Sequence, residues 1–106
     1  MKQRAIIAAM SQEFLAIAIW RPLPEKEAAS LDTLREISER IESRNYGRDH
    51  LYRTRDSEYV LLRYWKSEEA RQAAMEDPEL LRCWAKLGNE IQTIKVYEKL
   101  STLELS

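Results

Sequence analysis

The fold is decided by the stretch Tyr59-Val60-Leu61-Leu62-Arg63-Tyr64-Trp65-Lys66-Ser67-Glu68-Glu69-Ala70. Its first half, Tyr59 to Trp65, is rich in aromatic, β-branched and long apolar residues, which is typical of a strand. Its second half begins a helix, because Ser67 is a good N-cap and the two glutamates after it place negative charge in the first turn. The stretch therefore predicts that the indole of Trp65 lies where a strand passes into a helix.

The segments before this corner predict a strand and a long helix. Phe14 to Trp20 is a continuous apolar run, which is typical of a strand covered on both faces. Pro24 fits the first position of a helix that we expect from about Glu25 to Arg44. The apolar stripe of this helix repeats at spacings of three and four residues, at Ala28, Leu31, Leu34, Ile37 and Ile41.

A hairpin is predicted between this helix and the corner. Asn45 or Gly47 supplies the left-handed residue that ends the helix. Residues 48–54 then form the second strand, and the polar turn at residues 55–58 separates it from the third strand, Tyr59 to Trp65.

The chain after the corner predicts an interrupted helical region and a last strand. Pro78 disfavours helical geometry at Asp77, so we expect a kink or a break there, with Asp77 capping a new helix. The apolar stripe of the new helix consists of Leu80, Leu81, Trp84 and Leu87. The helix ends at Gly88, and residues 91–98 form the fourth strand.

The element order β-α-β-β-α-β predicts a ferredoxin-like α+β fold, in which both helical regions cover one face of a four-stranded antiparallel sheet. We expect one domain over residues 1–106, with its core at about 14–98 and a tail at 99–106. Residues 1–13 remain open between a short strand, a helical turn and an arm that covers a partner subunit. Because a single chain leaves one sheet face uncovered, a second subunit is expected on that face.

Composition excludes several classes of function. The chain has 106 residues, of which 17 are basic and 18 acidic, and this balance gives no electrostatic footprint for a nucleic acid. No stretch approaches the ~20 apolar residues of a membrane helix. The 2 glycines exclude phosphate-binding and dinucleotide-binding loops, which need several glycines at fixed spacing.

The cysteine and histidine content bounds the chemistry further. Cys83 is the one cysteine, so no disulfide framework forms within the chain, and a reducing, cytoplasmic location is expected. Cys83 is interpreted as a small buried thiol rather than a nucleophile. With 1 histidine, His50, the common histidine-rich metal sites are not expected.

The segment Trp65-Lys66-Ser67-Glu68-Glu69-Ala70, at the end of a strand in this topology, resembles the antibiotic biosynthesis monooxygenase-like family of small dimeric α+β barrel proteins. In that family a strand commonly ends in a tryptophan followed by a short polar residue, a serine, acidic residues and an alanine. Tyr46-Gly47 and Asp77-Pro78-Glu79-Leu80 also look like family features, so the resemblance covers roughly residues 14–98.

The resemblance implies a homodimer in which two sheets face each other and close a barrel, with a pocket between sheet and helices near Trp65. Members include oxygenases of polyphenols that need no metal or flavin, haem-degrading enzymes, and proteins without known activity. Haem-degrading members use a helical histidine and an asparagine on the first strand. Residues 68–88 here contain no histidine and residues 14–20 no asparagine, so we expect neither haem nor another cofactor or metal.

Arg63 and Trp65 have the same parity in the third strand, so both side chains should point to one face. Arg63 would stabilise a substrate anion there, and Trp65 would be a pocket wall, a core residue, or both. Trp84 is interpreted as a core residue or a further substrate contact. His50 is a candidate general base or a partly exposed structural residue, and Tyr52, on the face of His50, can bind an aromatic substrate or pack in an interface.

The sequence thus favours a cofactor-independent monooxygenase that acts on a quinol or polyphenolic aromatic molecule. In such chemistry the substrate anion itself reduces oxygen, and the protein deprotonates, orients and encloses it. The alternative is a non-catalytic dimeric protein of the same fold that binds a small molecule or a partner.

Overall fold

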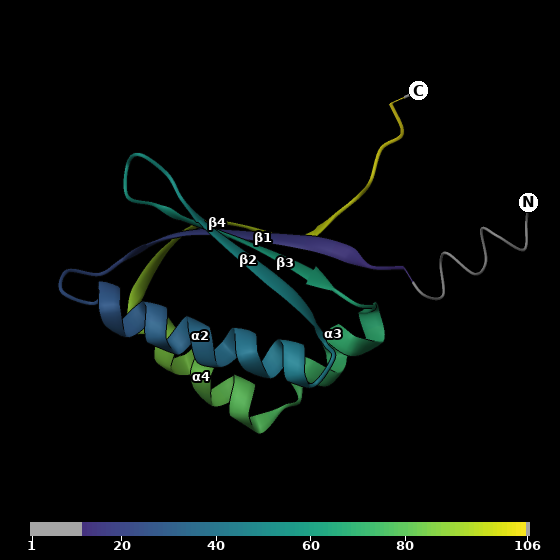
Figure 1. Cartoon of the computed structure of the whole chain (residues 1–106), viewed down its shortest axis with the longest axis horizontal. Coiled ribbons are helices and arrows are strands. Elements are labelled where there is room, and N and C mark those ends of the chain that lie inside the picture. Colours follow the sequence, from purple (N-terminus) through teal and green to yellow (C-terminus); the bar gives the residue numbers. More distant parts are fainter. Residues whose placement is uncertain (1–11, 106) are drawn as a thin grey trace, which may run out of the picture.

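The computed structural model describes residues 12–105, which form one antiparallel sheet with helices packed against one of its faces (Figure 1). The elements are β1 (Phe14–Pro22), α2 (Glu27–Ser43), β2 (Gly47–Arg53), β3 (Tyr59–Trp65), α3 (Glu68–Met75), α4 (Pro78–Gly88) and β4 (Ile91–Leu100). The strand order across the sheet is β2-β3-β1-β4, with every pair antiparallel. This confirms the ferredoxin-like α+β prediction.

The corner after Trp65 is built as its sequence predicts. The Ser67 side chain accepts a hydrogen bond from the backbone N–H of Ala70 at 3.0 Å and so caps α3. The helical region breaks before Pro78, and the Asp77 side chain accepts a hydrogen bond from the N–H of Glu79 at 3.0 Å and caps α4. The predicted break at Asp77 and the new helix that Asp77 caps are thus confirmed.

The expected start of the long helix is wrong. Glu25 has φ 65, a left-handed conformation, so Pro24 lies in a turn and α2 begins at Glu27. Leu34, Ile37 and Ile41 of the predicted apolar stripe are buried, but Ala28 is exposed. Ser30 and Thr33 are fully buried in addition. The first strand continues past Trp20, since Pro22 still pairs with Ile91 of β4.

The link from α2 to β2 uses Asn45 and Gly47 for different purposes. Asn45 is the left-handed residue, with φ 60, whereas neither glycine has a positive φ. A Cβ on Gly47 would lie 2.2 Å from the backbone oxygen of Tyr64, so glycine is needed there because β2 approaches β3 closely.

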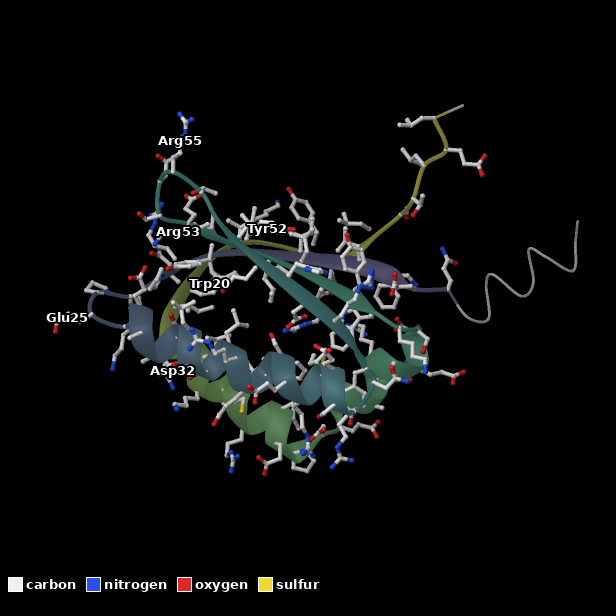
Figure 2. All side chains as sticks on the ribbon, viewed as in Figure 1. Trp20, Glu25, Asp32, Tyr52, Arg53 and Arg55 are labelled. Atoms are coloured by element: carbon white, nitrogen blue, oxygen red, sulfur yellow. The ribbon has the colours of Figure 1, made fainter. Side chains whose placement is uncertain are left out.

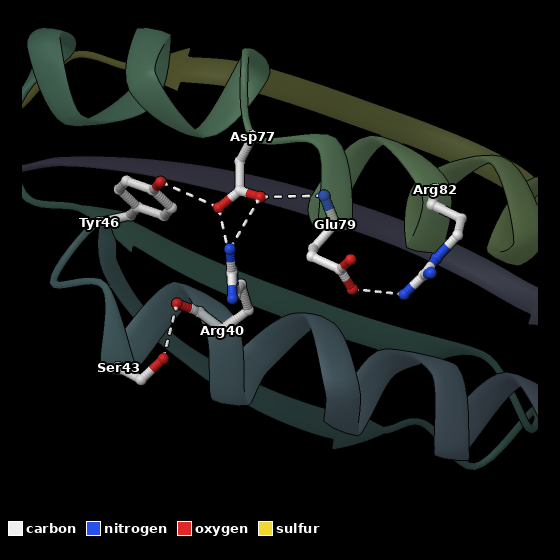
Figure 3. Close-up of polar contacts among 6 residues, drawn as sticks. All are labelled: Arg40, Ser43, Tyr46, Asp77, Glu79 and Arg82. Atoms are coloured by element: carbon white, nitrogen blue, oxygen red, sulfur yellow. Dashed lines mark hydrogen bonds and ion pairs between the residues drawn. The ribbon is translucent and has the colours of Figure 1, made fainter.

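Two apolar clusters fill the space between sheet and helices. The first contains Phe14, Ile37, Ile41, Trp65, Ala74, Leu80 and Cys83, and the second contains Trp20, Leu34, Tyr59 and Leu61. A polar group joins α2 to the start of α4 beside the first cluster: Arg40 donates to Asp77 at 3.0 Å, and the Tyr46 hydroxyl donates to the same carboxylate at 3.0 Å (Figure 3). These contacts fix the helices over the sheet.

The opposite face of the sheet is not covered within the described chain (Figure 1). The register places Leu15, Ile17 and Ile19 of β1 beside Leu62 and Tyr64 of β3 on this face, and all five are only half-buried. Figure 2 shows Tyr52 on this side of the sheet, away from the helices. No helix of residues 12–105 has the length and apolar character needed to cross a membrane.

Candidate functional site

A pocket of about 320 Å³ lies between the sheet and the helices α3 and α4. It exists because of the size pattern on the helix-facing side of β1, where Phe14 and Trp20 flank two alanines, Ala16 and Ala18. The large residues fill the two clusters, while the small ones leave space between them. The strand pattern therefore positions the pocket at the middle of the sheet.

Two indoles line this pocket, those of Trp65 and Trp84. Their predicted role as substrate contacts stays a prediction. Trp65 ends β3 and is only 3% exposed, so it belongs to the core and lines the pocket at once. Trp84 stands on α4, is half-buried and packs against the same core cluster. A flat apolar ligand in the pocket would contact one indole from the sheet and one from a helix.

Arg63 lies on the pocket wall beside Trp65, with its guanidinium carbon 5.5 Å from the centre of the indole ring. Its charge is not free. Nε and Nη2 donate to the two carboxylate oxygens of Asp49 at 2.7 and 2.8 Å, and the Ser38 hydroxyl donates to Asp49 at 2.5 Å. Because Nη1 is outside the bidentate pair, it is the guanidinium nitrogen available to a ligand.

Two further charged side chains line the pocket, Arg71 of α3 and Glu98 of β4. Arg71 makes an ion pair with Glu68 of its own helix at 3.3 Å. A smaller hollow of about 190 Å³ is lined by Arg71, Glu98, Glu68, Phe14 and Lys99, so charged groups surround this end of the pocket.

His50 and Tyr52 do not share this site. Both are exposed residues of β2 on the uncovered face of the sheet, where the His50 ring meets the edge of Tyr64 with ring centres 6.1 Å apart. Arg63, Trp65 and Trp84 are brought together, whereas His50 and Tyr52 lie across the sheet from them. The predicted catalytic and binding roles of those two residues stay predictions.

Sequence reasoning did not identify Asp49 or Glu98. The register makes Asp49 the direct cross-strand neighbour of Arg63, and an acidic residue with the parity of Leu51 in β2 was the available signal. Glu98 has the parity of Val96, which lines the same pocket. Both signals require knowing which strands are adjacent.

Cys83 lies outside the lining of this pocket. Cys83 is buried, its Sγ lies 3.5 Å from Glu36, and burial followed by this contact raises the pKa of the thiol. A raised pKa disfavours the thiolate, which agrees with a structural role. Within residues 12–105 no three histidine, cysteine or acidic side chains are grouped so that they could hold a metal ion.

No model of a known protein family matches the sequence, and no curated protein matches it. Solved structures do match. A protein from Mycobacterium tuberculosis aligns with a TM-score of 0.73 and 21% identity over 90% of this chain and 99% of that one. A variant of SnoaB, a cofactor-independent oxygenase from Streptomyces nogalater, aligns with a TM-score of 0.72 and 18% identity over 88% and 98%. An antibiotic biosynthesis monooxygenase aligns with a TM-score of 0.72 and 15% identity over 86% and 99%.

These matches extend across nearly the whole of each neighbour, so they compare complete domains. They show that the chain shares the ferredoxin-like α+β fold of these proteins. Within that class, its fold is the one found in antibiotic biosynthesis monooxygenase-like proteins.

Proposed function

We propose that this chain is a cofactor-independent monooxygenase that acts on a quinol or another polyphenolic aromatic molecule. The observation that carries the proposal is the grouping of two indole walls, Trp65 and Trp84, with the guanidinium of Arg63 in one apolar pocket of about 320 Å³. The pocket volume is at the lower end of the range for small-molecule sites. The fold shared with SnoaB supports the same class of reaction.

The proposed chemistry begins with removal of a proton from the bound aromatic molecule, which leaves an electron-rich anion. Nη1 of Arg63 stabilises the oxygen on which that charge develops, and the indoles hold the ring plane. At a substrate carbon that carries two hydrogens, oxidation to a carbonyl removes four electrons. Dioxygen accepts these four electrons, with one oxygen atom entering the carbonyl and the other leaving as water.

We further propose that the protein acts as a homodimer in the cytoplasm. The half-buried side chains Leu15, Ile17, Ile19 and Leu62 form an apolar surface on the uncovered face of the sheet, and the sheet of a second copy would remove it from water. The pocket lies on the helix side, so each copy would carry its own site.

A second candidate function is non-catalytic binding of a small aromatic molecule. The pairing of Arg63 with Asp49 favours it, because a guanidinium that already bonds a carboxylate offers less positive charge to a substrate anion. On this alternative the pocket recognises a neutral aromatic molecule by its indole walls alone.

Oxygen uptake by metal-free protein, measured with a panel of quinols and anthrones, tests the proposal. Uptake above the rate without protein is expected, and Trp84→Ala should lower it at least tenfold because one wall of the pocket is lost. Leu81→Ala is the matched control, since Leu81 is an exposed apolar residue of the same helix. No uptake with any member, together with aromatic binding that Trp84→Ala weakens, would identify a binding protein instead.

A further inference from the structure

Glu98 is the one charged side chain lining the pocket that lacks a partner among residues 12–105. Arg63 is paired with Asp49, and Arg71 is paired with Glu68. No hydrogen bond or ion pair within the described chain engages the Glu98 carboxylate, which is exposed at the pocket. A carboxylate whose oxygens are all free is equipped to accept a proton or a hydrogen bond from a bound molecule.

Regular alternation in β4 places this residue on the helix side, because Glu98 follows Val96 by two positions and Val96 lines the same pocket. An irregularity comes directly after it. Ile17 pairs with Tyr97, but Leu15 pairs with Leu100, so Glu98 and Lys99 together oppose the single residue Ala16. Both side chains reach the helix side of the sheet: Glu98 lines the pocket, and the Lys99 amine lies 4.9 Å from the centre of the Phe14 ring. Regular alternation would place Lys99 on the opposite face, so the bulge explains why the Lys99 amine lies beside Glu98 on the helix side.

The surroundings of Glu98 are mixed in charge. Arg71, Lys99 and Glu68 line the small hollow that Glu98 also borders. The two basic groups attract a carboxylate without contacting it, and the deeper walls of the pocket are apolar. Glu98 therefore stands at the pocket end where water meets the apolar interior, and a proton it accepts there has a route to solvent.

We infer that Glu98 is the general base of this pocket and takes a proton from an acidic C–H of a bound aromatic ketone. The inference rests on the proposed function and adds the residue that starts its chemistry. One carboxylate oxygen of Glu98 takes a proton from the substrate carbon, and the C–H bond breaks. Its electron pair passes into the ring system and the carbonyl becomes an enolate oxyanion, while Glu98 becomes a neutral carboxylic acid.

The division of roles follows from the two strands that flank β1 in the sheet. The carboxylate of Glu98 comes from β4 and receives the proton, whereas the guanidinium of Arg63 comes from β3 and can stabilise the oxyanion. With Glu98 as the base, neither His50 nor a tyrosine is needed to remove the proton.

Proton removal can be measured without oxygen. Anthrone is incubated with the full-length protein in D2O under argon, and exchange of its methylene hydrogens is followed by NMR. Wild-type protein should accelerate the exchange over buffer, and Glu98→Gln should reduce this acceleration by about a hundredfold, within the usual contribution of a general base. Glu104→Gln is the control, because Glu104 is an exposed residue of the segment after β4.

A second variant separates chemistry from structure. In Glu98→Ala, added formate should restore part of the exchange, because a small carboxylate can enter the space that the side chain leaves. Loss of a structural contact would not respond to formate. Exchange that is absent in wild type, or that is unchanged in Glu98→Gln, would overturn the assignment.

Oxygen uptake by the same proteins keeps this outcome distinct from that of the proposed function. Exchange that depends on Glu98 without any oxygen uptake would leave the base assigned and the oxygenase proposal rejected. Oxygen uptake that persists in Glu98→Gln would leave the oxygenase proposal in place and reject the base.

Discussion

Arg63 and Asp49 face each other across β3 and β2 and join their side chains through two hydrogen bonds of 2.7 and 2.8 Å. Both side chains are almost fully buried, with 11% and 4% of their surfaces exposed. Ser38 of α2 donates to the same carboxylate at 2.5 Å. The pair thus connects the pocket wall to the long helix, and it leaves Nη1 as the guanidinium nitrogen outside the two hydrogen bonds.

Asp49→Ala should destabilise the protein by about 3–5 kcal/mol, because the buried charge of Arg63 would lose its partner. Urea unfolding of both proteins, followed by circular dichroism, measures the difference. The double variant Asp49→Leu with Arg63→Met is the control, and its loss should be smaller than that of Asp49→Ala, since no buried charge remains. A cost below about 1 kcal/mol for Asp49→Ala would show that Arg63 finds water or another partner.

Local signals in the sequence were enough for the corner and the helix break. Ser67 and Asp77 act as caps within three residues of their own position, so no distant contact decides them. The start of α2 differs because Glu25, two residues before the helix, adopts a left-handed conformation, which residue propensities do not favour for a glutamate. The same turn is joined to a segment distant in sequence, since the N–H of Leu23 donates to the carbonyl oxygen of Glu90 at 2.9 Å.

Only those parts of the site that follow from side-chain alternation along one strand could be predicted from the sequence. Arg63 and Trp65 lie two residues apart on β3, so their common face follows from the pleat. The partnership of Arg63 with Asp49 depends on the register between β2 and β3, and the place of Glu98 depends on which strand lies beside β1. Such facts come from pairing between distant segments, which one sequence does not specify.

Because of the network of Asp77, Arg40 and Tyr46, the free energy of unfolding should depend on pH in the acidic range (Figure 3). The hydrogen bonds from Arg40, and then from Tyr46 and the N–H of Glu79, lower the pKa of Asp77 from 3.8 to about 2. A pKa that is lower in the folded state stabilises the protein above the unfolded value, and this contribution is lost as the pH falls from about 4 to about 2.

Asp77→Asn isolates this contribution, because asparagine still caps α4 but carries no charge for Arg40. The variant should be less stable than wild type at pH 6, and the difference should shrink steadily between pH 4 and pH 2. Urea midpoints of both proteins at several pH values in this range provide the measurement. A difference that stays constant down to pH 2 would mean that the carboxylate charge contributes nothing.

Alanine substitutions at the two glycines test whether the backbone leaves space for a Cβ at each position. Gly47→Ala should cost about 3 kcal/mol, at the upper end for overpacking, because its Cβ would meet the rigid backbone oxygen of Tyr64 at 2.2 Å. Gly88→Ala meets nothing within 4 Å and lies in the last turn of α4, so it should add about 0.5 kcal/mol through helix propensity. Thermal and urea unfolding of the two variants should therefore move in opposite directions, and equal shifts would contradict the close approach of β2 to β3.

The uncovered sheet face supplies the test of the proposed dimer. Leu62 of β3 lies there between Ile17 of β1 and His50 of β2, so Leu62→Lys would place an amine at the centre of the surface that a second sheet would cover. Burying that charge without a partner costs several kcal/mol, which exceeds what a small interface can offset. By light scattering, wild type should therefore have twice the 12.5 kDa mass of one chain, and Leu62→Lys should have the mass of one chain.

Leu81→Lys is the control for this prediction. Leu81 lies on the exposed surface of α4, so the variant should remain a dimer. A wild-type protein that is monomeric at micromolar concentration would reject the barrel arrangement and leave the apolar face of β1 and β3 to another partner.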